Sequence, residues 1–259
     1  MLEIAEKFNV SVSTIKRYKT KYGLTVNPDI AKQRNSERHS LYQCDRTYFD
    51  KIDTMDKAYL LGFLAADGFV TERNEIGIGV AEKDIAVVEF FQQQLKSNKP
   101  IFYKTGLYPS VELRVQNNYL CDAIKQLGII PNKSLVLNIE EIIKKADLSE
   151  KQISAFLLGY FDGDGCISIA HRQSDHTEYF EMNITGTLET INYYKNYFGH
   201  GTITKRHKDT KNNYTLQFSN NYSTIYNALS KLYMHKDELT FFFYRKYNLF
   251  AKLELIVKS

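Results

Sequence analysis

The chain contains few cysteines and no apolar segment of membrane length. Its three cysteines, Cys44, Cys121 and Cys166, are far apart and form no CxxC pair, which argues against a disulfide framework and a cysteine zinc site. No apolar run reaches the roughly 18 residues that a membrane helix needs. The start of the sequence, MLEIAEKFNV, lacks the basic and apolar regions of a signal peptide. We therefore expect a protein that is not secreted, has no membrane partner, and acts in the cytoplasm (if bacterial or phage-encoded) or inside an organelle.

The sequence also lacks a strong excess of charge of either sign. Its formal net charge is +4 and its pI is near 8.7. These values permit nucleic-acid binding but do not predict it, because a binding face must be basic locally. With 259 residues, of which 43% are hydrophobic, the chain can bury one substantial core or two smaller ones. We therefore expect a globular protein.

Residues 1–24 have the apolar spacing of two short helices. Ile4 and Phe8 lie on one helical stripe, and the pattern breaks at Asn9 and then restarts. This helix-turn-helix pattern places Lys16 and Arg17 on its second helix, where they suit the base edges and phosphates of a major groove. A solvated helical hairpin is the alternative. Because helix-turn-helix folds normally need a third packing helix, we expect this module to be minimal, truncated or braced by the next domain.

Two later stretches of the chain are nearly the same. LLGFLAADG spans residues 60–68 and LLGYFDGDG spans residues 157–165. Each is followed by an alternating strand, an amphipathic helix, a hairpin and another helix, and a duplicated unit assembles with pseudo-two-fold symmetry. We therefore expect an α+β chain with a helix-turn-helix at 1–24, a polar linker at 25–50, and two repeats at 51–147 and 148–259. Such symmetry matches that of duplex DNA.

Small residues predict that the two motif helices pack closely. Gly62 is followed four residues later by Ala66, and Gly159 by Gly163. Glycine costs about 1 kcal/mol inside a helix, so a close backbone approach is the expected compensation. A capping box predicts that the second helix begins at residue 149, and Gly165 is expected to end it as a left-handed cap.

Close packing would bring Asp67 and Asp164 together at the ends of the two helices. Each carboxylate would lie at the negative end of its helix dipole and would repel the other, so a cation is expected there. Mg²⁺, for which Mn²⁺ can substitute, takes carboxylate, carbonyl and phosphate oxygens. These are the parts of a metal-assisted phosphodiester hydrolysis. The alternative makes each Asp-Gly an ordinary helix end.

LLGFLAADG and LLGYFDGDG resemble the two signature helices of the LAGLIDADG homing endonucleases, in the single-chain form with two motif copies. The resemblance covers residues 51–259. It implies αββαββα repeats that form a saddle on DNA, and a monomer that cuts both strands of a long asymmetric target to leave short 3′ overhangs. It also implies that Asp67 and Asp164 bind metal, assisted by the carbonyls of Ala66 and Gly163. The earlier acidic position of the motif is not a metal ligand and is Ala65 in the first copy.

Basic residues are expected near the scissile phosphates, where they would stabilise developing charge or polarise water. Lys133 and Lys236 occupy matching places just after the late helix of each repeat, and Lys83 follows the first strand. We rank Lys133 and Lys236 above Lys83. Each is also consistent with an ordinary surface lysine.

Polar side chains on the outward faces of the predicted strands are candidates for DNA contact. Arginine, asparagine and glutamine can make bidentate contacts with bases, and lysines of a hairpin can bind phosphates in a salt-dependent manner. The candidates in the two repeats are Arg114, Asn183, Thr204, Lys205, Arg206, Lys208, Lys211 and Gln217.

Other functions fit parts of this pattern. A DNA-binding regulator without catalysis would be expected to lose the two carboxylates, and both are present. An RNA maturase could keep them, with host intron RNA as its partner, and this alternative stays open. An intein is disfavoured because the sequence ends LELIVKS without a terminal His-Asn. A site-specific DNA endonuclease is the leading hypothesis.

Overall fold

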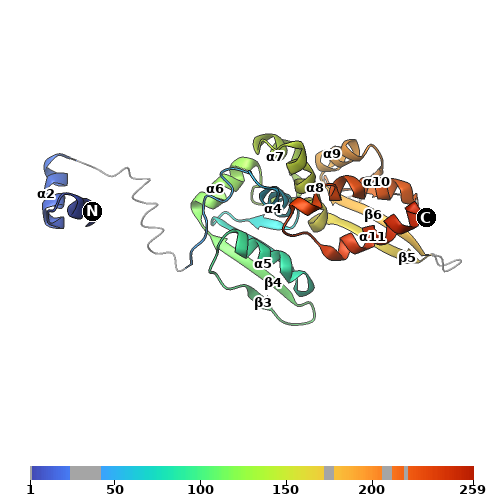
Figure 1. Ribbon diagram of the computed structural model, residues 1–259, viewed down its shortest axis with the longest axis horizontal. Helices are drawn as coiled ribbons and strands as arrows, with labels where there is room; N and C mark the ends of the chain where they lie inside the picture. Colours follow the sequence, from blue (N-terminus) through green and yellow to red (C-terminus); the bar gives the residue numbers. More distant parts are fainter. Residues whose placement is uncertain (1, 24–41, 172–177, 206–211, 219–220) are drawn as a thin grey trace. The chain divides into compact units, whose positions relative to one another are not determined.

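The computed structural model describes residues 2–23, 42–171, 178–205, 212–218 and 221–259 (Figure 1). The chain divides into two compact units, Met1–Gln43 and Cys44–Ser259. Most of the linker predicted at residues 25–50 lies outside the described residues, because residues 24–41 are not among them. In the described part, no helix has the length and apolar character needed to cross a membrane.

The first unit contains two short helices, α1 (Leu2–Lys7) and α2 (Val12–Lys21). The turn between them uses Asn9 at a φ of 48°, and Ser11 caps α2 by accepting a hydrogen bond from the Thr14 amide. The Lys16 and Arg17 side chains are exposed. Residues 2–23 thus contain the helical pair that the spacing predicts, without a third helix, and DNA binding by this pair stays a prediction.

The second unit contains two repeats of the same order. The first comprises α4 (Met55–Ala66), β1 (Gly68–Val70), β2 (Glu75–Ala81), the 3₁₀ turn η1 (Glu82–Asp84), α5 (Ile85–Gln94), β3 (Phe102–Lys104), β4 (Ser110–Gln116), α6 (Asn118–Leu127), η2 (Lys133–Leu135) and α7 (Ile139–Lys145). The second comprises α8 (Glu150–Asp164), β5 (Gly165–His171), β6 (Glu178–Gly186), α9 (Leu188–Phe198), β7 (Thr202–Lys205), β8 (Tyr214–Phe218), α10 (Tyr222–Tyr233), η3 (Lys236–Glu238) and α11 (Tyr244–Lys258).

Each repeat forms an antiparallel four-stranded sheet, in the orders β1-β2-β4-β3 and β5-β6-β8-β7. Alternating apolar residues such as Ile76 and Ile78 in β2 and Met182 and Ile184 in β6 are buried, as expected for a sheet with one covered face. Helices α5 and α6 pack on the first sheet, and α9 and α10 on the second (Figure 1). This confirms the predicted duplicated α+β fold.

Helices α4 and α8 cross at a reciprocal glycine contact. A Cβ placed on Gly62 would lie 1.9 Å from the Phe156 carbonyl oxygen, and one on Gly159 would lie 2.0 Å from that of Tyr59. The four residues correspond in pairs, since 159 − 62 and 156 − 59 both equal 97. The two backbones therefore touch through equivalent atoms, as the small residues predict.

The start of the second unit and the conformation of one helix cap differ from the prediction. The second unit begins at Cys44 rather than after residue 50, because Tyr48 and Phe49 are buried and pack edge to face with ring centroids 4.8 Å apart. The capping box at Ser149 begins α8 as predicted. Gly165, however, is extended at a φ of −95° and is not a left-handed cap. A Cβ there would lie 2.5 Å from the Phe161 carbonyl oxygen, so close approach accounts for this glycine.

Candidate active site at the ends of the motif helices

The two motif aspartates lie at adjacent helix ends. Asp67 is the residue that follows α4, and Asp164 is the last residue of α8. A Cβ on Gly163 would lie 2.5 Å from Cβ of Ala66 and 3.5 Å from Cβ of Asp67, so the helix ends are in contact. Asp67 is exposed and Asp164 is partly exposed. Both carboxylates are therefore accessible to a ligand.

Burial raises the pKa of both carboxyl groups, and the negative charge of Asp67 adds to the rise at Asp164. The pKa of Asp164 rises to about 6, mainly because of burial and secondly because of the negative charge of Asp67. Burial also raises the pKa of Asp67, while the positive charges of Lys133 and Lys246 oppose this shift. The ionised carboxylates are therefore less favourable at these helix ends than they would be in solvent.

Lys133, at the start of η2, supplies one of these cations. Its side chain is buried, and its Nζ donates a 2.6 Å hydrogen bond to the Ala66 carbonyl oxygen at the end of α4. Burial lowers the pKa of Lys133, and the charges of Asp164 and Asp67 oppose that effect. The Ala66 carbonyl, predicted to assist a metal, therefore binds an ammonium group.

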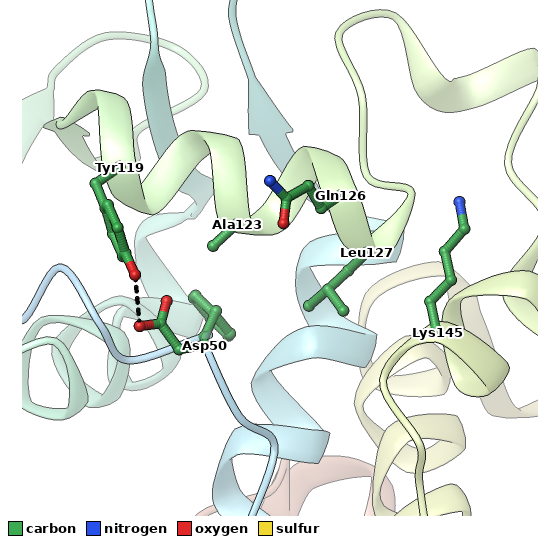
Figure 2. A pocket seen from close by; sticks show the side chains of 7 residues that line it. Asp50, Tyr119, Ala123, Gln126, Leu127 and Lys145 are labelled. Atoms are coloured by element: carbon green, nitrogen blue, oxygen red, sulfur yellow. Dashed lines mark hydrogen bonds between the residues drawn. The ribbon is translucent and has the colours of Figure 1, made fainter. Parts of the chain in front are cut away.

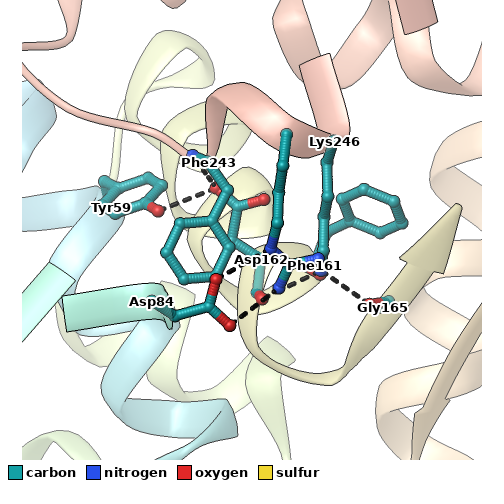
Figure 3. Close-up of polar contacts among 8 residues, drawn as sticks. Tyr59, Asp84, Phe161, Asp162, Gly165, Phe243 and Lys246 are labelled. Carbon is teal, nitrogen blue, oxygen red and sulfur yellow. Dashed lines mark hydrogen bonds and ion pairs between the residues drawn. The ribbon is translucent and has the colours of Figure 1, made fainter. Parts of the chain in front are cut away.

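Lys246, in the first turn of α11, supplies the second cation (Figure 3). Its Nζ donates hydrogen bonds to the carbonyl oxygens of Phe161 (2.6 Å), Asp162 (2.9 Å) and Gly165 (2.6 Å). Burial lowers its pKa to about 8, opposed by Asp162. An ammonium group thus binds three carbonyls at the end of α8, where the helix dipole is negative.

Sequence reasoning placed the second lysine at Lys236, and the structure places Lys246 at the helix end instead. The Lys236 ammonium group pairs with Asp237 and lies over the Tyr247 ring, and Lys83 is exposed in η1. The lysines whose charges act on Asp67 and Asp164 are Lys133 and Lys246. One signal was available, because the run FFFYRK carries a lysine three residues after its third phenylalanine.

The earlier acidic position of the second motif has a structural role. Asp162 is buried, and its Oδ2 accepts hydrogen bonds from the Tyr59 hydroxyl (2.7 Å) and the Phe243 amide (2.9 Å). Burial raises the pKa of Asp162, while Lys246 opposes the shift. This side chain joins α4, α8 and the start of α11, whereas the first motif has Ala65 at the matching position.

The donor set at the helix ends fits a hard divalent ion. Asp67 and Asp164 offer carboxylate oxygens, and Gly163 lies one residue before Asp164. Within the described ranges, no group of three or more His, Cys, Asp and Glu residues could hold a metal. An ion here would complete its shell with carbonyl, water or phosphate oxygens, which is the coordination that Mg²⁺ favours.

The candidate DNA contacts lie on both sheets. Asn183 in β6 is opposite Gln217 in β8, and among the described residues neither side chain has a hydrogen-bond partner. Thr204 and Lys205 belong to β7, the neighbour of β8. Arg114 in β4 already forms ion pairs with Glu75 and Glu112. Arg206, Lys208 and Lys211 lie outside the described residues.

Arg114 is held by three neighbours on the outward face of the first sheet. Its guanidinium group pairs with Glu112 (3.0 Å) and Glu75 (3.3 Å) and lies 4.9 Å from the ring centroid of Phe69. The two carboxylates raise the pKa of Arg114. The two ion pairs occupy Nε and Nη1, so a base contact that keeps them would use the remaining N–H groups of the guanidinium group.

A separate hollow lies between the segment after Cys44 and helices α6 and α7 (Figure 2). The Tyr119 hydroxyl donates a 2.9 Å hydrogen bond to Asp50 at its edge. The hollow is lined by Phe49, Asp50, Tyr119, Ala123, Gln126, Leu127 and Lys145. None of the candidate catalytic residues lines it.

Comparisons with known proteins agree with this geometry. Residues 157–252 match the family model described as LAGLIDADG endonuclease. The alpha subunit of ribonucleoside-diphosphate reductase NrdEB from Bacillus subtilis (strain 168) is 27% identical over 147 residues. That match covers 51% of this chain and 13% of the subunit, so the chain spans a small part of its curated relative.

Solved structures share the fold over both repeats. Meganuclease I-SmaMI bound to DNA is 15% identical, with a TM-score of 0.54 over 78% of this chain and 89% of that chain. The LAGLIDADG homing endonuclease I-LtrWI, bound to its target DNA, is 12% identical, with a TM-score of 0.51 over 83% and 92%. The family-model match covers the second repeat, and the two solved structures share the two-repeat fold with this chain.

Proposed function

We propose that the protein is a site-specific, double-strand DNA endonuclease of the homing class. The observation that carries this proposal is the pair of accessible carboxylates, Asp67 and Asp164, at touching helix ends beside two buried lysines. Repelling carboxylates with raised pKa values are costly to maintain, and perturbed ionisable groups of this kind cluster at functional sites. The fold shared with nucleases bound to DNA supports the same conclusion.

Asp67 and Asp164 would hold the divalent metal, Mg²⁺ with Mn²⁺ as a substitute, with the Gly163 carbonyl assisting. When bound, the metal would polarise a phosphodiester and lower the pKa of attacking water. Lys133 and Lys246 would contribute positive charge next to the negative charge that develops at each phosphate. Hydrolysis of one bond in each strand would leave short 3′ overhangs, as the family resemblance implies.

Double-stranded DNA is the proposed partner, with a long and asymmetric target. The two sheets differ in their outward residues, with Asn183 and Gln217 on one and the paired Arg114 on the other, so the two halves of the target should differ. Lys16 and Arg17 would extend the contact through the N-terminal helices. One chain contains both repeats, and we propose that it acts as a monomer in the cytoplasm or an organelle.

The test is cleavage of a randomised duplex library with Mg²⁺ by the intact protein and by Asp67→Asn and Asp164→Asn. The intact protein should cut a few related sequences, and each variant should bind them while cutting at least about a hundredfold more slowly, since metal sites lose that much even when a supporting group is removed. Asp53→Asn is the control, because Asp53 is a surface partner of Lys57.

Two other outcomes would favour a different function for the protein. Selective binding with no cutting in Mg²⁺ or Mn²⁺ would favour a regulator. Tighter binding of a host intron RNA than of any duplex would favour an RNA maturase.

A further inference from the structure

An ion pair joins the first repeat to the turn that carries Lys246. Arg245 binds the Asp84 carboxylate at two points, through Nε to Oδ1 (2.8 Å) and through Nη2 to Oδ2 (3.2 Å). Asp84 ends η1 in the first repeat, and Arg245 lies in the first turn of α11 in the second. Figure 3 shows Asp84 beside the group formed by Asp162, Phe243 and Lys246.

The Asp84 carboxylate is committed to this contact. Asp84 is the N-cap residue of α5, where an aspartate ordinarily accepts a hydrogen bond from the second or third amide of its own helix. Here it makes no such bond, and only 13% of its side chain is exposed. The N-terminus of α5 therefore has no side-chain cap, because the Asp84 carboxylate binds Arg245 at two points. A two-point contact of this kind is stronger than a single hydrogen bond between arginine and a carboxylate.

The first turn of α11 depends on contacts outside its own helix. No side chain caps it. The Phe243 amide donates to Asp162, the Arg245 guanidinium group lies 4.9 Å from the Phe243 ring centroid, and the next residue, Lys246, reaches the α8 carbonyls. From the first repeat, Asp84 thus holds the residue directly before Lys246, while Asp56 holds Thr240 earlier in the same segment through two hydrogen bonds (2.8 and 2.6 Å).

The matching place in the other half is neutral. Thr187 is the N-cap residue of α9, and its hydroxyl donates to the Leu137 carbonyl in the segment that follows Lys133. Thr187 also caps α9 by accepting from the Thr190 amide. The Asn212 side-chain amide also donates to the Leu135 carbonyl (2.9 Å). The Lys133 segment is therefore held to the second repeat by neutral hydrogen bonds, whereas the residue beside Lys246 is held to the first repeat by an ion pair.

We propose that Asp84 and Arg245 are positioning residues for Lys246, and that their ion pair sets the cutting rate of one DNA strand and leaves the other strand unaffected. The inference rests on the proposed endonuclease function. It assigns no contact with DNA to Asp84 or Arg245. Their effect passes through the place at which Lys246 is held.

The first experiment measures lysine position without DNA or metal. The full chain and its Asp84→Asn and Arg245→Gln variants are treated with acetic anhydride, and the acetylation rate of each lysine is read by peptide mass spectrometry. Lys246 should be protected in the intact protein and should react about tenfold faster in both variants, while Lys133 stays protected. Lys151→Gln is the control, because it removes the exposed ion pair with Glu238 in the same repeat.

The second experiment measures the nicking rate of each strand on a target selected from the duplex library. Asp84→Asn and Arg245→Gln should slow one strand about tenfold or more, the range for groups that orient an active-site residue, with the other strand unchanged. Arg245→Lys should keep part of the rate. The exchanged pair, Asp84→Arg with Arg245→Asp, should restore the ratio of the two strand rates towards that of the intact protein.

Several results would overturn the inference. Unchanged Lys246 acetylation in both variants would show that the pair does not position it. Equal slowing of both strands, or faster acetylation without a change in the strand ratio, would remove the link to one strand. If the intact protein cuts no duplex, the endonuclease proposal fails on its own, and the acetylation result still decides whether the pair positions Lys246.

Discussion

The two halves of the candidate site share a backbone and differ in their polar contacts. At the end of α4, Lys133 makes one hydrogen bond, to the Ala66 carbonyl. At the end of α8, Lys246 makes three. The glycine contacts between the helices are the same in both directions, within 0.1 Å for the nearest atom (2.0 − 1.9 Å). Duplication has kept the helix crossing, while the surrounding charges have diverged.

The divergence centres on one position of the motif. Asp162 is buried and binds Tyr59 and Phe243, and Ala65 takes its place in the first copy. In the described part of the molecule, the Asp162 Oδ1 atom is buried without a hydrogen-bond partner, so this half contains an incompletely satisfied charge. We expect changes in backbone packing to destabilise both halves equally. Changes in charge should affect the two halves differently.

The largest expected effect tests the glycine contact between α4 and α8, which the two halves share. Gly62→Ala and Gly159→Ala should each destabilise the protein by roughly 3 kcal/mol or more, because a methyl group would force two backbones apart. Urea unfolding measures this. Gly79→Ala is the control, since its nearest neighbour would be a side-chain atom 3.6 Å away. Tolerance of alanine at one site alone would contradict the symmetric crossing.

The next effect separates the two lysines. Lys133→Met should cost about 1–3 kcal/mol and Lys246→Met about 3 kcal/mol or more, since each buried carbonyl that loses its donor costs about 1–3 kcal/mol. Lys133 satisfies one such carbonyl and Lys246 satisfies three. Thermal or urea unfolding at pH 7 gives both values. Equal costs would mean that the extra contacts of Lys246 contribute nothing to stability.

A smaller effect comes from the raised pKa of Asp164. The folded protein holds this proton more tightly than the unfolded chain, because the folded pKa is about 6 and the ordinary value is 3.8. Its contribution to stability is therefore present at pH 4 and is lost as pH rises to about 6 and above. Asp164→Asn should match the intact protein near pH 4 and exceed it by roughly 1–2 kcal/mol at pH 7 without divalent metal.

Urea unfolding across this pH range measures that difference. Asp53→Asn should behave in the opposite way, because Lys57 lowers the pKa of Asp53. An Asp164→Asn variant that is less stable than the intact protein at pH 7 would contradict the assigned shift.

The smallest expected effect compares the two sheets. Gln217→Ala should weaken binding to a selected target about tenfold, the loss of one base contact. Arg114→Ala should weaken it less than about threefold, because Glu112 and Glu75 already bind the guanidinium group. Fluorescence anisotropy with Ca²⁺ in place of Mg²⁺ measures both. A larger loss at Arg114 would mean that its guanidinium group contacts the DNA, through its remaining N–H groups or after the ion pairs open.

The sequence alone predicted the motif helices, the alternating strands and the helix crossing, but not the helices α7 and α11. Alternation in EIGIGV and EYFEMNITG and the matched glycines are local patterns, and the physical rules for them act over a few residues. The same rules identified Asp67 and Asp164 as site candidates. Each lies at the end of a helix in which two small residues, four positions apart, indicate close helix packing. The local pattern also placed the second unit's start too late, since two aromatic residues in a polar stretch give no period.

Only the tertiary structure decided which second lysine reaches the site. Lys236 follows the late helix as Lys133 does, but Lys246 lies ten residues further on (246 − 236), and the chain returns to the α8 end there. A lysine side chain becomes a ligand of helix-end carbonyls only where the backbone passes within its reach. The contacts of Asp84 with Arg245 and of Asp162 with Phe243 were also decided by the tertiary structure. Each joins residues more than 80 positions apart in the sequence, so no local pattern predicts it.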